Sequence, residues 1–284
     1  MATKDLELQK QYSTVVIKPR KGWVPLNLQD LWNYRELAYF LTWRNIKVRY
    51  KQSVLGILWA IIKPFLTMVV FAIIFGGLLN VPSDGVPYPI FSYAATLPWE
   101  LFAASLTAVG GSMVASGGMI SKIYFPRIIL PISSVLSNLV DFAIGFVILI
   151  GMMIFYKIPL TINVLWTIPF ILLAMITAMG VGLWLAALMV RYRDISYITG
   201  FLTTLWFYLS PVIISTNTIP DQYRMLYSLN PMAGVIMGFR YSLLGVAIPI
   251  PLYGMLASAG IAVVILVSGL YYFRRMEKDF ADMI

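Results

Sequence analysis

Residues 31–79, LWNYRELAYFLTWRNIKVRYKQSVLGILWAIIKPFLTMVVFAIIFGGLL, change character half way along. The first half mixes aromatic with basic side chains, whereas the second half, from about Gly56, is apolar and has Lys63 as its one charge. An apolar run of this length can cross the ~30 Å hydrocarbon core of a bilayer as a helix. A basic, aromatic-rich segment that leads directly into such a span is typical of a helix on the membrane surface. We therefore expect an amphipathic interfacial helix over 30–54, followed by a transmembrane helix.

The interfacial segment carries a row of cations. If it is helical, Arg44, Lys47 and Lys51 fall at i, i+3 and i+7 and form one stripe, with Arg49 close by in the sequence. Such a stripe fits two roles. It can set the orientation of the chain and contact anionic lipid head groups, or it can bind an anionic substrate. The sequence leaves both roles open.

The composition of the 284-residue chain is that of a membrane protein. The chain is 60% hydrophobic and only 12% charged, which is about half the charged content of an ordinary soluble domain. It has no cysteine and no histidine, so disulfides, thiolate and imidazole metal ligands and the commonest general base are all excluded. We assign the net charge of +9 to orientation in a membrane rather than to nucleic-acid binding, because of where the basic residues are placed.

Six apolar stretches are long enough to cross a bilayer, and we expect each to be a helix, because an open strand in lipid leaves backbone groups unpaired. They are residues 56–79, 89–116, 128–156, 163–190, 195–215 and 252–273. With the N-terminus inside, 17 of the 21 Lys and Arg residues lie on cytoplasmic segments and three on external ones. This asymmetry follows the positive-inside rule, and we expect both termini in the cytoplasm.

The chain is expected to divide at its membrane boundaries. Residues 1–29 form a polar cytoplasmic tail, 55–273 a six-span transmembrane domain, and 274–284 a second cytoplasmic tail. Between the fifth and sixth spans, residues 210–251 contain five prolines and only short apolar runs, one of them interrupted by Arg240. Short segments at membrane depth are tolerated where they pack inside protein. We therefore expect re-entrant helices on the external side, with an ordinary external loop as the alternative.

The sequence lacks the motifs of several enzyme classes. It contains no G-x-x-x-x-G-K-[ST], no G-x-S-x-G and no H-E-x-x-H, so we assign no catalytic and no metal-binding residue. Asp141, about half way along the third span, is a functional candidate because a lone charge in hydrocarbon is costly. A structural carboxylate bonded to a neighbouring helix is the simpler interpretation. Lys63 lies near the inner leaflet and can extend its amine to the surface.

Two further groups of residues are candidates for function. Six aromatic side chains lie deep in the spans or cluster there, where they can stack on sugar rings or simply pack: Trp59, Tyr93, Trp99, Trp206, Phe207 and Tyr208. The loop between the second and third spans combines aromatics with base, which suggests a docking surface for another protein, with anchoring at the inner interface as the alternative. Its residues are Ser121, Lys122, Ile123, Tyr124, Phe125, Pro126 and Arg127.

Four segments carry a family resemblance in their order and spacing. They are WRNIKVRYKQSVLGILWAIIKPFLTMVVFAIIFG (43–76), KIYFPRIILP (122–131), VRYRDI (190–195) and LNPMAGVIMGFR (229–240). Together they resemble the polysaccharide-exporting permeases of the ATP-binding-cassette superfamily, the group that moves O-antigen, capsule and teichoic acid chains. Lys63 departs from that pattern, in which an uncharged polar residue is commoner.

The resemblance implies a homodimer of six-span subunits in the bacterial cytoplasmic membrane, with a substrate path between them. It implies two separate ATPase subunits that bind ATP and magnesium, and no cofactor in this chain. The loop Ser121–Arg127 would be the coupling helix that meets those ATPases. The substrate would be a lipid-linked glycan, often anchored through a diphosphate. We expect that diphosphate to meet cations at the inner surface, namely Arg44, Lys47, Arg49, Lys51 and Arg127.

Two other functions remain open at this point. One is a permease of the same type for drugs or small lipids, whose path would be narrower and less rich in aromatic rings. The other is a membrane-embedded glycan transferase, which needs clustered polar catalytic residues in an external loop. The acids Asp84, Glu100 and Asp221 are scattered along the sequence, so the transferase is the weaker of the two.

Overall fold

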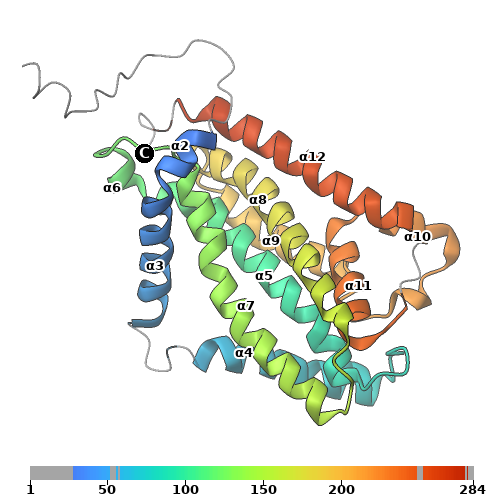
Figure 1. Ribbon diagram of the computed structural model, residues 1–284. Coiled ribbons are helices and arrows are strands. Elements are labelled where there is room, and N and C mark those ends of the chain that lie inside the picture. The colour runs from blue at the N-terminus through green and yellow to red at the C-terminus, as the bar shows by residue number, and fades with distance from the viewer. Residues whose placement is uncertain (1–27, 52–55, 57, 248–251, 279, 281–284) are drawn as a thin grey trace, which may run out of the picture.

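The computed structural model describes residues 28–51, 56, 58–247, 252–278 and 280, and within these ranges all regular structure is helical (Figure 1). Most of the expected N-terminal tail therefore lies outside the described residues. The elements are α2 (Leu28–Asn33), α3 (Arg35–Lys51), α4 (Leu58–Phe71), η1 (Ala72–Leu78), α5 (Tyr88–Ala115), α6 (Gly117–Ile120), α7 (Ile129–Phe155), η2 (Ile162–Trp166), α8 (Thr167–Arg191), α9 (Ile195–Tyr208), η3 (Thr216–Thr218), α10 (Asp221–Tyr227), α11 (Pro231–Leu244) and α12 (Leu252–Met276).

Four of the six expected spans are confirmed as helices of spanning length and apolarity. In the described part of the chain they are Leu58–Leu78, Ile129–Phe155, Ile162–Arg191 and Leu252–Met276. The fifth expected span differs from the prediction, because α9 ends at Tyr208 after 14 residues. A helix of that length covers only about 21 Å, which is less than a bilayer core. The remaining expected span, 89–116, corresponds to α5. This helix is long enough to cross a bilayer but is less apolar than the four spans above.

Helix α5 is the centre of the bundle. It contacts α4, α7, α8 and α11, and most of its side chains are buried by protein. This position explains its hydroxyl-bearing residues, which would be unfavourable toward lipid. Thr96 Oγ1 donates to the carbonyl of Ser92 at 2.8 Å, and Ser112 Oγ donates to the carbonyl of Val109 at 2.7 Å. Each hydroxyl is therefore satisfied by its own helix, and α5 crosses the core as a helix that protein rather than lipid surrounds.

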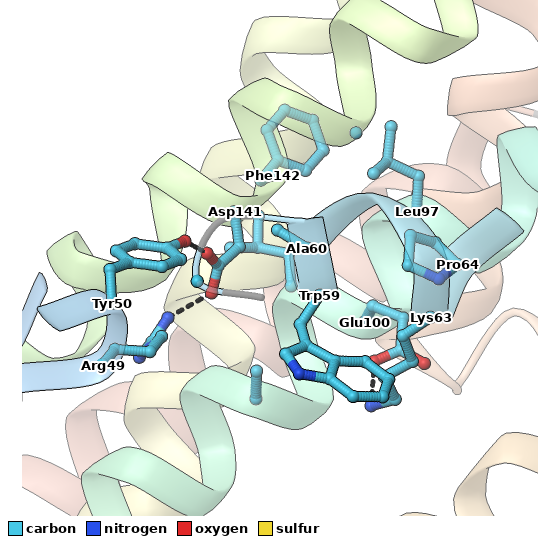
Figure 2. Close-up of a pocket in the computed structure, with 14 residues that line it drawn as sticks. Arg49, Tyr50, Trp59, Ala60, Lys63, Pro64, Leu97, Glu100, Asp141 and Phe142 are labelled. Atoms are coloured by element: carbon cyan, nitrogen blue, oxygen red, sulfur yellow. Dashed lines mark hydrogen bonds and ion pairs between the residues drawn. The ribbon is translucent and has the colours of Figure 1, made fainter. Parts of the chain in front are cut away.

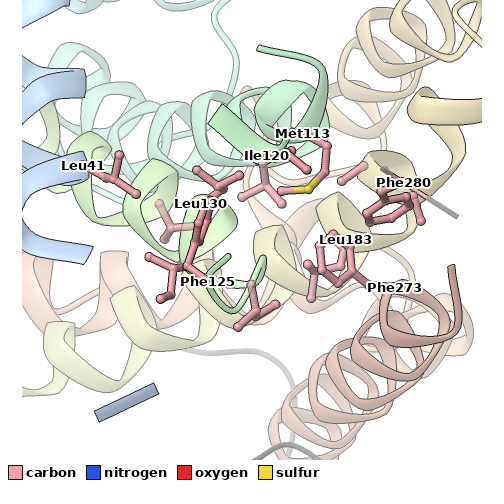
Figure 3. Close-up of a cluster of buried hydrophobic side chains, with 14 residues drawn as sticks. Leu41, Met113, Ile120, Phe125, Leu130, Leu183, Phe273 and Phe280 are labelled. Carbon is pink, nitrogen blue, oxygen red and sulfur yellow. The ribbon is translucent and has the colours of Figure 1, made fainter. Parts of the chain in front are cut away.

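One buried apolar cluster holds together the end of the bundle at which α2, α6 and residue 280 lie (Figures 1 and 3). It joins residues from most elements at that end: Leu41 of α3, Met113 of α5, Ile120 of α6, Phe125, Leu130 of α7, Leu183 of α8, Phe273 of α12 and Phe280. Because Phe280 is fully buried, this residue beyond the end of α12 belongs to the same folded unit. The cluster fixes the position of the loop that follows α6.

Helices α8 and α12 approach each other through two glycines. A Cβ atom added to Gly269 would lie 2.2 Å from the carbonyl oxygen of Gly180, and one added to Gly180 would lie 2.6 Å from the backbone nitrogen of Leu266. Both distances are to backbone atoms, which cannot move aside as a flexible side chain can. Small residues that allow such close approach are the usual basis of helix packing in membranes.

We expect Gly269→Ala to destabilise the protein, because the methyl group collides with the backbone of α8. Overpacking a tight site costs ~1–3 kcal/mol, and here the helices must separate. Gly260→Ala on the same helix is the matched control, since nothing lies within 4 Å of its added Cβ, and both variants gain the same ~1 kcal/mol in helix propensity. Thermal unfolding of the purified proteins in detergent measures the difference. Equal midpoints for the two variants would contradict this account of the contact.

The segment predicted as an interfacial helix, 30–54, is helical as two pieces, α2 and α3, and its residues 52–54 lie outside the described residues. Helix α3 packs along α7, and its one buried side chain is Leu41. Aromatic residues on α2 and α3 stay exposed, among them Trp32, Tyr39 and Phe40. The segment therefore has a bundle-facing side and an exposed aromatic side, and its last turn reaches the middle of α7, where the candidate site begins.

Candidate functional site

A cavity of about 320 Å³ lies where α3, α4, α5 and α7 meet (Figure 2). Each helix contributes part of its lining, and four of the lining residues are charged: Arg49, Lys63, Glu100 and Asp141. The two acids sit near the middles of the two longest neighbouring helices. Asp141 lies 12 residues after the start of α7 and 14 before its end, and Glu100 lies 12 after the start of α5 and 15 before its end.

The first ion pair of the cavity joins α3 to α7. Arg49 donates from Nη1 to Asp141 Oδ2, and from Nη2 to Asn138 Oδ1 at 2.8 Å, while the Tyr50 hydroxyl donates to Asp141 Oδ1. Asn138 and Asp141 are three residues apart on α7 and so share one face of that helix. Asn138 Nδ2 also donates to Ser105 Oγ on α5 at 3.3 Å. The interpretation of Asp141 as a carboxylate bonded to a neighbouring helix is therefore confirmed.

The second ion pair joins α4 to α5. Lys63 Nζ lies 3.2 Å from Glu100 Oε2. The sequence suggested that the lysine can extend its amine to the inner membrane surface, and in the structure the amine faces Glu100, half way along α5. Its side chain is 69% exposed, although its partner lies at the centre of a long helix. Glu100, which seemed isolated in the sequence, thus belongs to a polar site.

The five cations expected to bind a substrate anion have different surroundings in the structure, and some are bound by other groups of the chain. Arg49 is held by Asp141 and Asn138, as described above. Arg127 donates from Nη1 to the carbonyl of Glu277, and its backbone N–H lies 3.3 Å from Glu277 Oε1. Arg44, Lys47 and Lys51 are exposed on α3, where Lys47 Nζ lies 5.5 Å above the ring of Trp43. Only these last three present their charge openly to an incoming anion.

The loop expected to form a coupling helix has a different local structure. The short helix α6 covers Gly117–Ile120, and residues 121–127 are non-helical, with turns at 121–122 and at 127. Pro126 accounts for this, because it lacks a backbone N–H and disfavours helix at the residue before it. Helical structure over Ser121–Arg127 is therefore corrected to α6 followed by a non-helical loop.

The side chains of this loop point in different directions. Tyr124 is 70% exposed and Ile123 is also exposed, with Ser121 and Lys122 beside them. Phe125, in contrast, is 5% exposed and packs in the buried cluster of Figure 3. The guanidinium of Arg127 lies 5.8 Å from the centre of the Phe280 ring. A docking surface on this loop would thus be formed by residues 121–124, with Phe125 and Arg127 holding the loop in place.

The six aromatic residues proposed for a substrate path are also divided. Tyr93 is fully buried and donates to the carbonyl of Gly145 at 3.2 Å, and Trp99 is buried as well. Trp206 donates from Nε1 to Asn230 Oδ1 at 2.8 Å, and Phe207 packs on Trp99. These four have internal contacts in the subunit, whereas Trp59 and Tyr208 are exposed. Of the two, Trp59 lines the charged cavity.

Sequence reasoning missed the role of Arg240 of α11, which it counted as an external surface charge. Arg240 is 3% exposed, and its guanidinium donates to the carbonyls of Phe91 (3.2 Å), Pro211 (2.8 Å), Val212 (2.8 Å) and Ile214 (3.3 Å). It also lies 3.5 Å from the centre of the Phe91 ring. It therefore holds the non-helical segment after α9 against the start of α5. The one available signal was an arginine inside an otherwise apolar run.

The described residues contain no group of three or more acids that could hold a metal ion. The cavity carries two acids, but each is bonded to a cation within the chain. Such paired charges are suited to bind or to pass a polar molecule. They do not form the acid and base pair that hydrolysis or transfer requires.

Comparison with known proteins identifies the family. A family model described as ABC-2 type transporter matches residues 36–244. The O-antigen export system permease protein RfbA of Myxococcus xanthus is 28% identical over 261 residues, which cover 90% of this chain and 98% of that protein. RfbA of Klebsiella pneumoniae is 27% identical, covering 88% and 95%. The polysialic acid transport protein KpsM of Escherichia coli is 22% identical, covering 70% and 77%.

Proposed function

The chain belongs to the ABC-2 type transporter family, as a multi-pass membrane permease rather than an enzyme, and from this premise we propose that it exports lipid-linked polysaccharide across the bacterial cytoplasmic membrane. The observation that carries the proposal is the match to two RfbA proteins, which are named as O-antigen export permeases and align over nearly their whole length. The similarity to a polysialic acid transport protein supports the same substrate class. The glycan differs between these relatives, so the shared chemistry is a long sugar chain.

The proposed subunit has six spans, with the fifth made of α9 and the non-helical segment that follows it to residue 215. Backbone without helical bonds is tolerated at membrane depth only where its polar groups are satisfied by protein. The carbonyls of Pro211, Val212 and Ile214 meet this condition, because all three accept hydrogen bonds from Arg240. An even number of spans, together with the positive-inside distribution, supports cytoplasmic placement of both termini.

Helices α10 and α11 are proposed as re-entrant helices on the external side. They have 7 and 14 residues, so neither can cross the bilayer. Nearly all of α11 is buried by protein, and it begins at Pro231 and ends at Leu244, where the following Gly245 adopts a left-handed conformation with φ of 68°. A helix that starts and stops so sharply, and that is covered by protein, fits a segment that enters the membrane and returns.

The energy source is proposed to be a separate pair of ATPase subunits that bind ATP and magnesium, since this chain has no nucleotide-binding loop of its own. A second copy of the chain is proposed as the other half of the path. Helices α4 and α9 support this arrangement, because each keeps an apolar or aromatic side uncovered by its own subunit, including Phe65 on α4 and Tyr197 and Phe201 on α9. In a dimer these sides would face the partner or the path.

The diphosphate of the lipid-linked substrate is proposed to be recruited by the exposed stripe Arg44, Lys47 and Lys51. An exposed cation contributes only about 1 kcal/mol toward an anionic membrane surface. A set that holds a diphosphate through charge-assisted hydrogen bonds contributes more, ~1.5–3 kcal/mol for each bond. Arg49 and Arg127 are not included in this recruiting set, because carboxylate or carbonyl groups of the chain already bind them.

Reconstitution with the partner ATPase in vesicles tests this function. We expect no ATP hydrolysis by the permease alone, and ATP-driven export of the cell's lipid-linked glycan by the complex. Replacing Arg44 and Lys47 by Gln should raise, at least tenfold, the glycan concentration that half-stimulates the ATPase. Eight Lys and Arg residues remain before residue 55, so the orientation of the chain should be unchanged.

Arg275→Gln with Lys278→Gln is the control, because these exposed cations also lie at the expected cytoplasmic end and their loss changes the net charge equally. If the two double variants respond alike, the stripe on α3 serves orientation and lipid contact alone. If the wild-type complex transports no glycan, the proposed substrate class is wrong.

A further inference from the structure

The charged cavity between α3, α4, α5 and α7 is open to the surface of the subunit. Its charged side chains would be unfavourable in contact with lipid tails. Side-chain exposures are 35% for Arg49, 32% for Asp141 and 34% for Glu100, although both acids lie half way along long helices. A charge exposed to hydrocarbon at that depth is costly. The cavity is therefore a polar space, occupied by water or by a hydrophilic ligand.

The balance of charges in this space decides which class of ligand fits. Arg49 and Lys63 supply two positive charges and Asp141 and Glu100 supply two negative ones, and each cation is already paired with an acid. A diphosphate would add negative charge to a neutral set, and the displaced carboxylates would be left without partners. A neutral ligand with many hydroxyl groups meets no such penalty, because each hydroxyl can donate to a carboxylate and accept from a cation.

A flat apolar surface lies next to these polar groups. Trp59 of α4 is 54% exposed and lines the same cavity as the Arg49–Asp141 pair and the Lys63–Glu100 pair (Figure 2). The apolar face of a sugar ring stacks on such an aromatic surface while its hydroxyls reach polar groups at the edge. The volume of about 320 Å³ is at the small end of the ~300–1,000 Å³ of ligand pockets, which suits a short length of glycan.

We propose that this cavity is a saccharide-binding site, in which Trp59 stacks on a sugar ring and the two ion pairs exchange hydrogen bonds with its hydroxyls. The inference rests on the proposed function for its ligand. It differs from the recruitment of the diphosphate in place and in chemistry, because the stripe on α3 is exposed and cationic whereas the cavity is neutral. The two sites would hold the head and the sugar chain of one substrate.

Cysteine labelling tests the site directly, because the native chain has no cysteine. Ala104→Cys places a thiol on the cavity wall, where Ala104 is exposed. In the reconstituted complex we expect a maleimide to react with this thiol, since the reaction needs water. The free glycan, released from the native lipid carrier by acid hydrolysis, should slow the reaction at least fivefold. Inorganic pyrophosphate at the same concentration should not slow it.

Two controls separate binding in the cavity from other effects. Ile162→Cys, at an exposed position on η2, should react equally with and without glycan. Trp59→Leu in the Ala104→Cys background should abolish the protection, whereas Trp43→Leu, which removes an exposed tryptophan of α3 outside the cavity lining, should leave it unchanged. Both replacements are at exposed side chains, so neither should prevent folding.

The outcomes are distinct. Absence of labelling at position 104 would mean that lipid fills the cavity, and protection by pyrophosphate but not by glycan would mean an anion site; either result overturns the proposal. Labelling that neither compound affects also overturns it. Export of lipid-linked glycan is measured on the same vesicles. If export proceeds while the glycan gives no protection, the saccharide site is wrong and the proposed function stands.

Discussion

Replacing Arg240 by leucine should abolish the folded protein or lower its thermal unfolding midpoint more than any other single change proposed for this chain. The guanidinium is buried and donates to four backbone carbonyls, which come from the start of α5 and from the segment after α9. A buried acceptor that loses its donor costs about 1–3 kcal/mol. The total for Arg240→Leu is therefore expected to exceed ~3 kcal/mol, even if the leucine fills part of the space.

The planar fork of the arginine matters as much as its charge. Nε, Nη1 and Nη2 all donate hydrogen bonds, so the guanidinium binds carbonyls that lie in different directions around it. A lysine presents its donors from a single nitrogen and cannot reach all four carbonyls. Arg240→Lys should therefore keep the charge but still destabilise the protein, with a midpoint between those of the wild type and Arg240→Leu.

Arg224→Leu is the matched control for this prediction. Arg224 of α10 lies close by in the sequence and is paired with Asp221 at 2.7 Å, but the side chain of Asp221 is 87% exposed. A pair with so exposed a partner contributes ~0–1 kcal/mol, and Arg224 donates to one backbone carbonyl, that of Ile219 at 3.2 Å, against four for Arg240, so this variant should lower the unfolding midpoint far less than Arg240→Leu. The measurement is thermal unfolding of purified protein in detergent, together with the yield of monodisperse protein. Similar midpoints for Arg224→Leu and Arg240→Leu would remove Arg240 from its assigned role.

Sequence reasoning predicted the parts of the fold that depend on local pattern. The apolar stretches that include Leu58–Leu78, Ile129–Phe155 and Leu252–Met276 were expected as helices on length and composition alone, and they form as expected. The start of α11, for which no prediction was made, also depends on local pattern, since Asn230 accepts from the N–H of Met232 at 3.0 Å and Pro231 occupies the first turn. Such features are decided by residues within one or two helical turns of each other.

Pairing between distant residues could not be predicted in the same way. Arg49 and Asp141 are 92 positions apart, and Lys63 and Glu100 are 37 apart. In the sequence each of these residues looks like a single charge, so snorkelling seemed the better explanation for Lys63 and isolation for Glu100. The cavity exists only because α3 and α4 pack on α5 and α7. The hydrophobic pattern of one segment does not indicate which other segment it packs against. The contact between Arg240 and Phe91, which are 149 positions apart, could not be predicted for the same reason.

The roles of the residues in the loop between α6 and α7 could be predicted only in part from the sequence. The loop's mixture of aromatic and basic residues suggested a docking surface, but the sequence pattern treated Tyr124, Phe125 and Arg127 as equivalent. In the structure Phe125 is a core residue and Arg127 binds the chain after α12. Alanine at all three positions would combine loss of docking with loss of packing. A test of ATPase docking must therefore leave Phe125 and Arg127 in place.

Replacing Ile123 and Tyr124 by serine should uncouple the permease from the proposed ATPase subunits while leaving the fold intact. Both side chains are exposed, and a few exposed aromatic and apolar anchors dominate most protein interfaces, often at 2 kcal/mol or more each. We expect binding to the partner ATPase at least tenfold weaker and loss of export, with membrane insertion and thermal unfolding unchanged. Tyr253→Ser is the control. It removes an exposed tyrosine in the first turn of α12, far from the loop in the sequence, and should have no effect. Export at the wild-type level by the Ile123→Ser, Tyr124→Ser variant would show that this loop does not carry the contact, and the ATPase would then have to dock elsewhere on the same end of the bundle.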